Sequence, residues 1–369
     1  MCTKKKALIA MSGGVDSSVA AYLTKKAGFD CMGITMKLYN NEDAGISKEK
    51  SCCSIDDIAD ARNVCSKLGI PYYVFNFTDD FKKNVIDRFI KAYECGCTPN
   101  PCIDCNKYLK FDRLYRRAAE TGNDFIVTGH YARIEKQGER FVLKKALDLS
   151  KDQSYVLYSL TQQQLAHTMF PLGGMTKPEA RRIAEENAFI NARKHDSQDI
   201  CFVPDGDYAS VIELHTGKSY PSGNFVTRDG RILGKHKGII RYTIGQRKGL
   251  GLALPEPMYV YDKNVEKNEV ILCKNEELFS RELEADEFNW IMYDNPPEKF
   301  RAKAKIRYNQ TEQWAEITVK ESGTVRIVFD EPQRAIAKGQ AVVLYDGDSV
   351  IGGGTICRKE MRMYYAERT

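Results

Sequence analysis

Residues 6–18 read KALIAMSGGVDSS, and this stretch decides the fold class. A short apolar run leads into Ser12-Gly13-Gly14, and helical periodicity follows over residues 15–27. Glycines allow a tight turn that brings backbone N–H groups against an anion. The start of the following helix adds the positive end of its dipole. The stretch therefore predicts a phosphate-binding turn between a strand and a helix.

The polar residues of this turn extend the prediction. Ser12, Ser17 and Ser18 can donate further hydrogen bonds to a phosphate, and Asp16 could hold Mg²⁺ against it. The turn is not the Walker type, which needs a GK[ST] sequence. A bare SGG would favour an ordinary strand-to-helix turn, but the whole stretch in this context favours nucleotide binding.

Strand-like and helix-like segments alternate through the first part of the chain. This alternation predicts a parallel sheet with crossover helices, in an α/β domain that we place at residues 1–205. The expected strands are 6–11, 31–38, 72–77 and 125–128, and the expected helices are 15–27, 56–68, 80–93 and 108–119.

The pattern changes after the α/β domain. Glycine-rich and basic loops separate short segments over residues 206–280, which predicts a small linking domain. Beyond residue 281 the runs are short and β-like, which predicts an all-β barrel or sandwich over 281–369, with Trp290 and Trp314 in its core. The expected β runs are 301–308, 313–319, 324–329, 340–345 and 350–357.

Bulk properties narrow the class of protein. A chain of 369 residues exceeds the usual size of one core, so two or three domains are expected. Its net charge of +5 suits a polyanionic partner but is weak evidence alone. No apolar stretch approaches the roughly 18 residues that a membrane span needs. The N-terminus runs into the glycine turn without a cleavage site, so we expect a cytoplasmic protein.

The 12 cysteines are unevenly spread, with an adjacent pair at 52–53 and four between residues 95 and 105, and this clustering points to sulfur or metal chemistry. Residues 98–106 read TPNPCIDCN, so two prolines stiffen a loop that presents Cys102 and Cys105 before the helix expected at 108–119. A helix N-terminus and the nearby Lys107 predict a lowered thiol pKa there. Cys201, in the segment HDSQDICF, is a candidate nucleophile only if a second thiol partners it, because a lone cysteine is usually a small buried hydrophobe.

A metal site is an open alternative for the cysteine cluster. Cys95 and Cys97, together with Cys102 and Cys105, offer four ligands at a plausible spacing for Zn²⁺ or an iron–sulfur cluster.

Elsewhere, residues 235–248 form a basic segment with Tyr242 interleaved. Basic side chains neutralise phosphates and aromatic rings stack on splayed bases, so this segment predicts RNA binding, with a solvated basic loop as the alternative.

Taken together, the motifs resemble those of the tRNA-specific 2-thiouridylase family. The resemblance covers almost the whole chain and rests on long motifs in the right order: SGGVDSS, the segment from Cys52-Cys53 to Asp57, TPNPCIDCN, GHYAR at 129–133, KDQSY at 151–155, DSQDICF, and YTIGQRKGLG at 242–251. It implies a PP-loop domain of the adenine nucleotide α-hydrolase-like type, a small bridging domain and a C-terminal β-barrel.

The resemblance also implies an activity and partners. ATP, accompanied by Mg²⁺, adenylates the C2 oxygen of the wobble uridine U34 of tRNA, and sulfur from a cysteine persulfide replaces that oxygen. The expected acceptors are the tRNAs for Lys, Glu and Gln, and the expected sulfur donor is a cysteine desulfurase or a sulfur-relay protein. Two alternatives remain: a PP-loop transferase that uses a metal cluster, and a non-catalytic RNA-binding protein that uses ATP as a switch.

Site residues follow from matching positions of the motifs. Cys105 is expected to be the catalytic nucleophile and Cys201 to carry the persulfide. Some relatives have aspartate at the position of Cys102, so the role of that residue is in doubt. Residues 95–106 are the candidate for a loop that closes over the base. The expected ATP-binding residues are Ala10, Met11, Ser12, Gly13, Gly14, Val15, Asp16, Ser17, Met36 and Gly129; those at the target base are Asn100, Pro101 and Cys102; and those contacting tRNA are His130, Lys151, Asp152, Gln153, Arg307, Tyr308 and Gln340.

Overall fold

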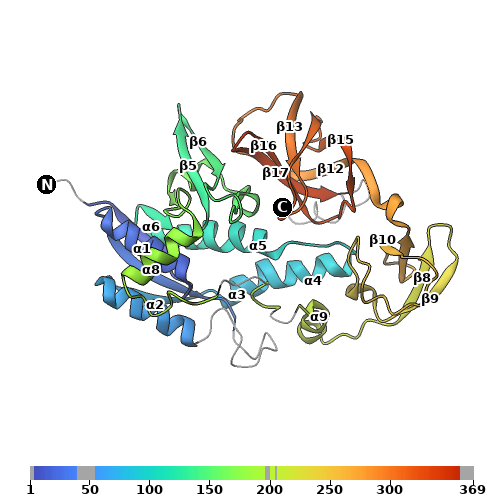
Figure 1. Cartoon of the computed structure of the whole chain (residues 1–369), viewed down its shortest axis with the longest axis horizontal. Helices are drawn as coiled ribbons and strands as arrows, with labels where there is room; N and C mark the ends of the chain where they lie inside the picture. The colour runs from blue at the N-terminus through green and yellow to red at the C-terminus, as the bar shows by residue number, and fades with distance from the viewer. Residues whose placement is uncertain (1–3, 40–54, 196–199, 204–205, 358–369) are drawn as a thin grey trace. The chain divides into compact units, whose positions relative to one another are not determined.

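A computed structural model of the chain describes residues 4–39, 55–195, 200–203 and 206–357 (Figure 1). The chain forms two compact units, each of which combines separate stretches of sequence. The first unit consists of Met1–Ile86, Pro101–Asp207 and Gly347–Val350, and the second consists of Asp87–Asn100, Tyr208–Asp346 and Ile351–Thr369. No helix within the described ranges has both the length and the apolar content that a bilayer crossing requires.

The first unit is built on a five-stranded parallel sheet; the sequence predicted a parallel sheet and four of these strands, but not β7. Its strand order is β3-β2-β1-β4-β7, and every neighbouring pair runs parallel. The strands are β1 (Lys6–Ala10), β2 (Asp30–Lys37), β3 (Tyr72–Asn76), β4 (Phe125–Val127) and β7 (Thr168–Met169).

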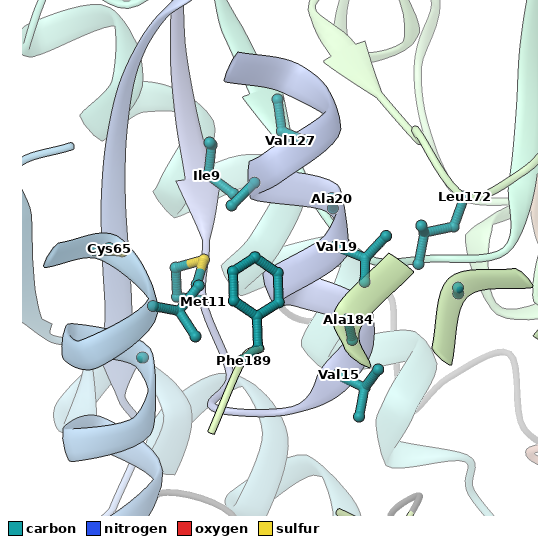
Figure 2. Packing of buried hydrophobic residues seen from close by; sticks show 14 of the residues in the cluster. Ile9, Met11, Val15, Val19, Ala20, Cys65, Val127, Leu172, Ala184 and Phe189 are labelled. Atoms are coloured by element: carbon teal, nitrogen blue, oxygen red, sulfur yellow. The ribbon is translucent and has the colours of Figure 1, made fainter. Parts of the chain in front are cut away.

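The core of this unit lies between the sheet and its helices. Helix α1 (Val15–Lys26) contacts α2 (Ile55–Leu68) and α8 (Lys177–Glu186). Figure 2 shows side chains of α1, α2, α8 and β1 meeting in one apolar cluster, with Ile9 and Val19 fully buried. Because α1 starts directly after β1, this packing fixes the connecting turn at one edge of the sheet.

The helices around the cysteine motif differ from the prediction. The helix expected at 108–119 begins at Pro101 and runs as α5 (Pro101–Asp104), a π-helical segment η2 (Cys105–Arg113) and α6 (Leu114–Glu120). Proline suits the first helical position, because its fixed φ matches the helix and its missing N–H would have no partner there. Cys102 and Cys105 therefore lie on a helix, and the prediction of a loop for them was wrong.

Several shorter elements complete the first unit. The helix expected at 80–93 consists of three consecutive segments, of which the last belongs to the second unit. An antiparallel hairpin, which the sequence analysis missed, pairs Ala132 with Lys145. The first-unit elements are α3 (Thr78–Phe81), η1 (Lys82–Ile86), β5 (Ala132–Gln137), β6 (Arg140–Lys145), η3 (Ser154–Leu157) and α7 (Gln162–Ala166), and the second-unit segment is α4 (Asp87–Glu94).

The second unit contains a small four-stranded sheet in the order β10-β11-β8-β9. Its central pair, β11 and β8, is parallel, and the outer pairs are antiparallel. Besides α4, the elements here are α9 (Tyr208–Thr216), β8 (Gly223–Thr227), β9 (Ile232–His236), η4 (Ile239–Arg241), β10 (Tyr259–Asn264), β11 (Glu269–Cys273) and η5 (Asn275–Leu278).

The C-terminal strands form a closed barrel, which resolves the choice between barrel and sandwich. The order is β12-β15-β14-β13-β16-β17, and β12 also pairs with β17, for example Ala285 with Ile356, so the sheet closes on itself. The strands are β12 (Phe279–Trp290), β13 (Lys299–Lys305), β14 (Gln313–Val319), β15 (Val325–Arg334), β16 (Ala341–Asp346) and β17 (Ser349–Cys357), of which β12 was not anticipated. The domain boundaries at 205 and 280 stay predictions.

Candidate active site

The turn after β1 has the geometry of an anion site. Gly13 adopts φ +75°, and a Cβ there would lie 2.5 Å from the carbonyl oxygen of Asp57, so only glycine fits. Gly14 is the N-cap of α1, and within the described residues no side chain caps this helix. The first N–H groups of a helix have no partner inside it. They are therefore available to a phosphate in the first turn of α1.

A second glycine closes against this turn. Gly129 follows β4, and a Cβ on it would lie 2.8 Å from the carbonyl carbon of Asp16 and 2.8 Å from the backbone nitrogen of Ser17. Any larger residue would clash with the backbone of α1. The carboxyl end of β4 and the first turn of α1 thus lie so close that only glycine fits at position 129.

The other residues expected at ATP lie at the same edge of the sheet. Ala10 ends β1, and the N–H of Met11 donates to the carbonyl of Ile34 (2.7 Å) in β2, the strand that also carries the half-buried Met36. The carboxyl ends of parallel strands are where ligands bind in open α/β sheets. The structure therefore brings the predicted nucleotide residues of β1, β2 and β4 to one edge.

The serines of the turn bond to the turn itself. The hydroxyl groups of Ser17 and Ser18 each donate to the carbonyl of Gly14 (3.0 Å), and the N–H of Ser12 donates to Ser17 Oγ (3.2 Å). Asn191, which the sequence analysis missed, donates from Nδ2 to the carbonyl of Gly13 (2.8 Å). These bonds hold the turn in shape, and the predicted contacts of the serines with phosphate stay predictions.

The carboxylate of Asp16 is engaged by two donors. Nζ of Lys177 lies 2.7 and 2.8 Å from its two oxygens, and the hydroxyl of Tyr131 donates to Oδ1 (2.9 Å). An ammonium group thus lies at the carboxylate where the expected Mg²⁺ would bind, and the role of Asp16 as a Mg²⁺ ligand stays a prediction.

The thiol of Cys105 is buried, and the expectation of a lowered pKa is wrong. Burial raises the pKa of Cys105, and the neighbouring Cys102 and Asp104 raise it further, against the opposing charge of Lys110. The helix start that was expected to lower the pKa lies at Pro101, so Cys105 is already in the second turn. Cys102, in the first turn, is exposed.

Cys201 has a different environment. Cys201 is half-buried, and its backbone carbonyl accepts a hydrogen bond from the hydroxyl of Tyr39 (2.8 Å). The ring of the next residue, Phe202, packs edge-on against Phe81 with centroids 5.7 Å apart. Residues 196–199 of the same motif, and Cys52-Cys53 of another, lie outside the described residues.

The metal-site alternative finds no geometric support. In the described ranges, no three side chains of His, Cys, Asp or Glu converge as metal ligands would. Cys97 is almost fully buried, and desolvation raises its pKa to about 11, which disfavours the thiolate that binds metals.

The segment that leads into Asn100 is held by the barrel, within the second unit. Nε2 of Gln340 donates to the carbonyl of Thr98 (2.9 Å), and the N–H of Thr98 donates to the carbonyl of Lys338 (2.8 Å). Nζ of the buried Lys263 lies 3.5 Å from the carbonyl of Cys97. Gln340, expected to contact tRNA, thus has a partner within the protein.

The residues expected at tRNA in the first unit are mostly engaged as well. His130 is buried between Phe111 and Phe170, its Nδ1 lies 2.7 Å from Thr128 Oγ1, and burial holds its pKa well below 6.5. Asp152 accepts from the backbone of Ala146 and Ser154, and Gln153 Oε1 accepts from the N–H of Tyr131 (2.9 Å). Lys151 is half-buried, and its backbone N–H donates to the carbonyl of Asp148 (3.0 Å).

In the second unit the expected RNA contacts divide. Arg307 donates to the carbonyl of Ala335, and Tyr308 is exposed beside Lys305. The prediction that Tyr242 stacks on bases is wrong, because its ring is 3% exposed and packs on Phe225. His236, from the same basic segment, is also buried.

Comparison with known proteins agrees with this architecture. Family models match three consecutive parts of the chain: a tRNA methyl transferase HUP domain at residues 5–205, a tRNA methyl transferase PRC-barrel domain at 209–274, and an aminomethyltransferase beta-barrel domain at 280–356. A 4-thiouridine synthetase–RNA complex with bound ATP is 19% identical, covering 57% of this chain and 50% of that one, with a TM-score of 0.34, too low to carry an argument.

Curated relatives match over nearly their full length. A "tRNA-specific 2-thiouridylase MnmA" of Clostridioides difficile (strain 630) is 52% identical over 358 residues, which is 96% of this chain and 99% of that protein. A relative of the same name from Clostridium botulinum (strain Alaska E43 / Type E3) is 51% identical over 354 residues, 96% of this chain and 98% of that protein.

A parallel-sheet domain with a PP-loop turn, a PRC-barrel domain and a closed β-barrel define a tRNA-modifying enzyme. Within that class, the chain belongs to the tRNA-specific 2-thiouridylase family, as its motifs predicted.

Proposed function

We propose that this enzyme uses ATP to activate the C2 oxygen of uridine 34 in tRNA and replaces that oxygen with sulfur from a cysteine persulfide. The observation that carries the proposal is the uncapped first turn of α1, closed by Gly129 and held by glycine backbone, in a chain whose relatives are 2-thiouridylases. The turn supplies an anion site, and the family supplies the reaction.

ATP is needed because an oxygen on C2 is a poor leaving group. Transfer of AMP to that oxygen turns it into an ester of AMP, which leaves far more easily. The N–H groups at the start of α1 are aimed at the polyphosphate and stabilise the charge that develops as pyrophosphate departs. In this proposal Gly129 keeps the adjacent strand end close enough to complete the site.

The sulfur step assigns different roles to the two cysteines. Cys201, which is half-buried, accepts a terminal sulfur from a cysteine desulfurase or a relay protein. The persulfide attacks C2, a C–S bond forms, and the C–O bond to AMP breaks. Cys105 then attacks Sγ of Cys201, so the S–S bond to the base breaks and a Cys105–Cys201 disulfide forms. A two-electron reductant restores both thiols before the next turnover.

The burial of Cys105 supports this order of events. Its raised pKa keeps the thiol protonated near neutral pH, so it does not consume the persulfide before the base is in place. A second route has Cys105 release sulfide, which then attacks C2. The two routes leave the same disulfide and differ only in whether the base is bonded to Cys201 in an intermediate.

The RNA has to present its base outside the stack, because an in-stack C2 edge is shielded. We propose that Asn100, Pro101 and Cys102 surround the base, and that His130, Lys151, Asp152, Gln153, Arg307, Tyr308 and Gln340 contact the tRNA.

The expected acceptors are the tRNAs for Lys, Glu and Gln, and the expected compartment is the cytoplasm. Cys102, which is exposed, stands where some relatives have an aspartate.

The test is a reconstitution with ATP, Mg²⁺, unmodified tRNA, and a desulfurase with cysteine. Wild type is expected to form 2-thiouridine, detected by mass spectrometry of digested nucleosides, and to release pyrophosphate. Cys105→Ser and Cys201→Ser are each expected to lose thiolation while still releasing pyrophosphate, because activation precedes sulfur transfer. Cys357→Ser, a change at another half-buried cysteine, is the matched control.

Two results would contradict the proposal. Full thiolation by either cysteine variant in a single turnover removes the persulfide mechanism. Absence of pyrophosphate release by wild type with ATP and tRNA removes the activation step and favours ATP as a switch only.

A further inference from the structure

The geometry points to Lys177 as a positioning residue of the nucleotide site: it neutralises Asp16, so that the start of α1 faces the ATP polyphosphate without a competing negative charge, and Asp16 is not a magnesium ligand. This inference rests on the proposed use of ATP. It concerns a residue that no motif of the sequence singled out.

Asp16 is placed where a bare carboxylate would oppose nucleotide binding. It is in the first turn of α1, whose N–H groups form the proposed phosphate site, and its side chain is one-third exposed. The carboxylate of Asp16 and a phosphate bound at this turn would repel each other, and such repulsion is stronger near a protein surface than in bulk water. The carboxylate therefore needs a local cation for the turn to attract a polyphosphate.

Lys177 is fixed in place to supply that cation. It is the first residue of α8, its backbone N–H donates to Asp148 Oδ2 (3.1 Å), and the preceding Thr176 is tied to Glu179 by two hydrogen bonds of 2.7 and 2.8 Å. Only 6% of Lys177 is exposed. The backbone of Lys177 is thus held by a helix cap, independently of the ion pair.

Tyr131 contacts both members of the ion pair and helps to fix the positions of their side chains. Its ring is buried, its hydroxyl donates to Asp16 Oδ1, and Nζ of Lys177 lies 5.8 Å from the ring centroid. Two hydrogen bonds join the backbone of Tyr131 to Gln153. The N–H of Tyr131 donates to Gln153 Oε1 (2.9 Å), and the backbone N–H of Gln153 donates to the carbonyl of Tyr131 (2.9 Å). Both Asp16 oxygens are therefore satisfied by groups with fixed positions.

The arrangement disagrees with the expected role of Asp16 as a holder of Mg²⁺. A cation bound to Asp16 would have to displace the ammonium of Lys177 and leave it buried beside a second positive charge. Displacing a buried partner in this way is costly. The two roles predict opposite effects of removing the Asp16 charge, which makes them separable by experiment.

The experiment measures ATP affinity of the full chain by calorimetric titration, once with Mg²⁺ and once with EDTA, without tRNA. The variants are Lys177→Met, Asp16→Asn and the double variant. Lys177→Met is expected to weaken ATP binding by about tenfold or more, because it leaves an unpaired carboxylate at the phosphate site. Asp16→Asn is expected to bind ATP as tightly as wild type or more tightly, and the double variant within about threefold of wild type.

Lys144→Met is the matched control, because this lysine of β6 is also ion-paired, with Glu135 (3.0 Å) and Asp348 (3.4 Å), and lies outside the proposed nucleotide site. It should leave ATP affinity unchanged. The inference is overturned if Lys177→Met binds ATP normally, or if Asp16→Asn weakens Mg²⁺–ATP binding and the double variant is equally weak. If Lys177→Met does not fold, Asp16→Asn alone still decides. Failure of wild type to bind ATP would instead overturn the proposed function.

Discussion

Nε2 of Gln340 lies 2.9 Å from the carbonyl oxygen of Thr98 and 3.4 Å from that of Pro99. The neighbouring Gly339 also lies close to this segment, since a Cβ on Gly339 would lie 3.0 Å from Cβ of Cys97. The residues just before Asn100 are thus held by main-chain and side-chain bonds to residues 338–340. The barrel positions the start of the cysteine motif, in addition to any contact with RNA.

Replacing Gln340 by glutamate tests this positioning role. The shape is kept, but the amide donor becomes a carboxylate that faces two carbonyl oxygens. The loss of a hydrogen bond and the added repulsion are expected to lower the thiolation rate about tenfold, or about 1.4 kcal/mol, at saturating ATP and tRNA. Single-turnover kinetics measure this rate. Gln313→Glu, at a side chain with only a local 3.5 Å bond, is the control. A rise in KM for tRNA with an unchanged rate would show that Gln340 acts only through RNA.

Gly129→Ala tests the close approach of β4 to the nucleotide turn. The added methyl group would lie 2.8 Å from main-chain atoms of Asp16 and Ser17, which cannot move without shifting α1. We expect ATP affinity to fall by about tenfold or more, a loss of roughly 1.4 kcal/mol or greater. Calorimetric titration with ATP measures it. Gly174→Ala adds the same methyl group where nothing lies within 4 Å, and equal losses in both variants would refute the steric explanation.

The buried His130 should make stability depend on pH. Its folded-state pKa is well below 6.5, so between pH 6.5 and that lower value the unfolded chain binds more protons than the folded one. Stability is therefore retained above pH 6.5 and lost as the pH falls below it, by at most about 1.4 kcal/mol per pH unit from this group.

Denaturant titrations at several pH values between about 7.5 and 5 can detect this contribution. His130→Asn keeps a polar partner for Thr128 and removes the titrating ring, so its stability should fall less steeply with acid than that of wild type. Burial also lowers the pKa of His236, which stays in both proteins and contributes equally. Parallel pH curves for the two proteins would mean that His130 takes up its proton without opening the fold.

The two cysteines of the TPNPCIDCN motif should differ in reactivity. Cys102 is exposed, whereas Cys105 is buried and its pKa is raised. Because the thiolate is the reactive form, iodoacetamide near pH 7.5 is expected to modify Cys102 at least about tenfold faster. Fragment ions of the shared tryptic peptide locate each label. Labelling in denaturant, where both should react alike, is the control, and equal rates in the folded protein would refute the burial of Cys105.

Local sequence patterns predicted elements well where a strand or helix buries one clear face. The turn at Gly13-Gly14 and the parallel strands around it were found because apolar runs and glycines are local features. Strand β12 was missed because it carries several charges on its exposed positions. Trp314 was expected in the core but is 48% exposed, because Ala315 and Ile317 point into the barrel and alternation turns Trp314 outward beside Arg301 and Lys303.

The sequence by itself determined the order of strands and helices around the nucleotide turn and the family to which the chain belongs. Only the tertiary structure decided which charges pair and which thiols are shielded. Asp16 and Lys177 are 161 residues apart in the chain, and no local pattern connects them. The reason is physical: ion pairing and desolvation depend on distance and on exclusion of water, and both arise only when remote segments pack together.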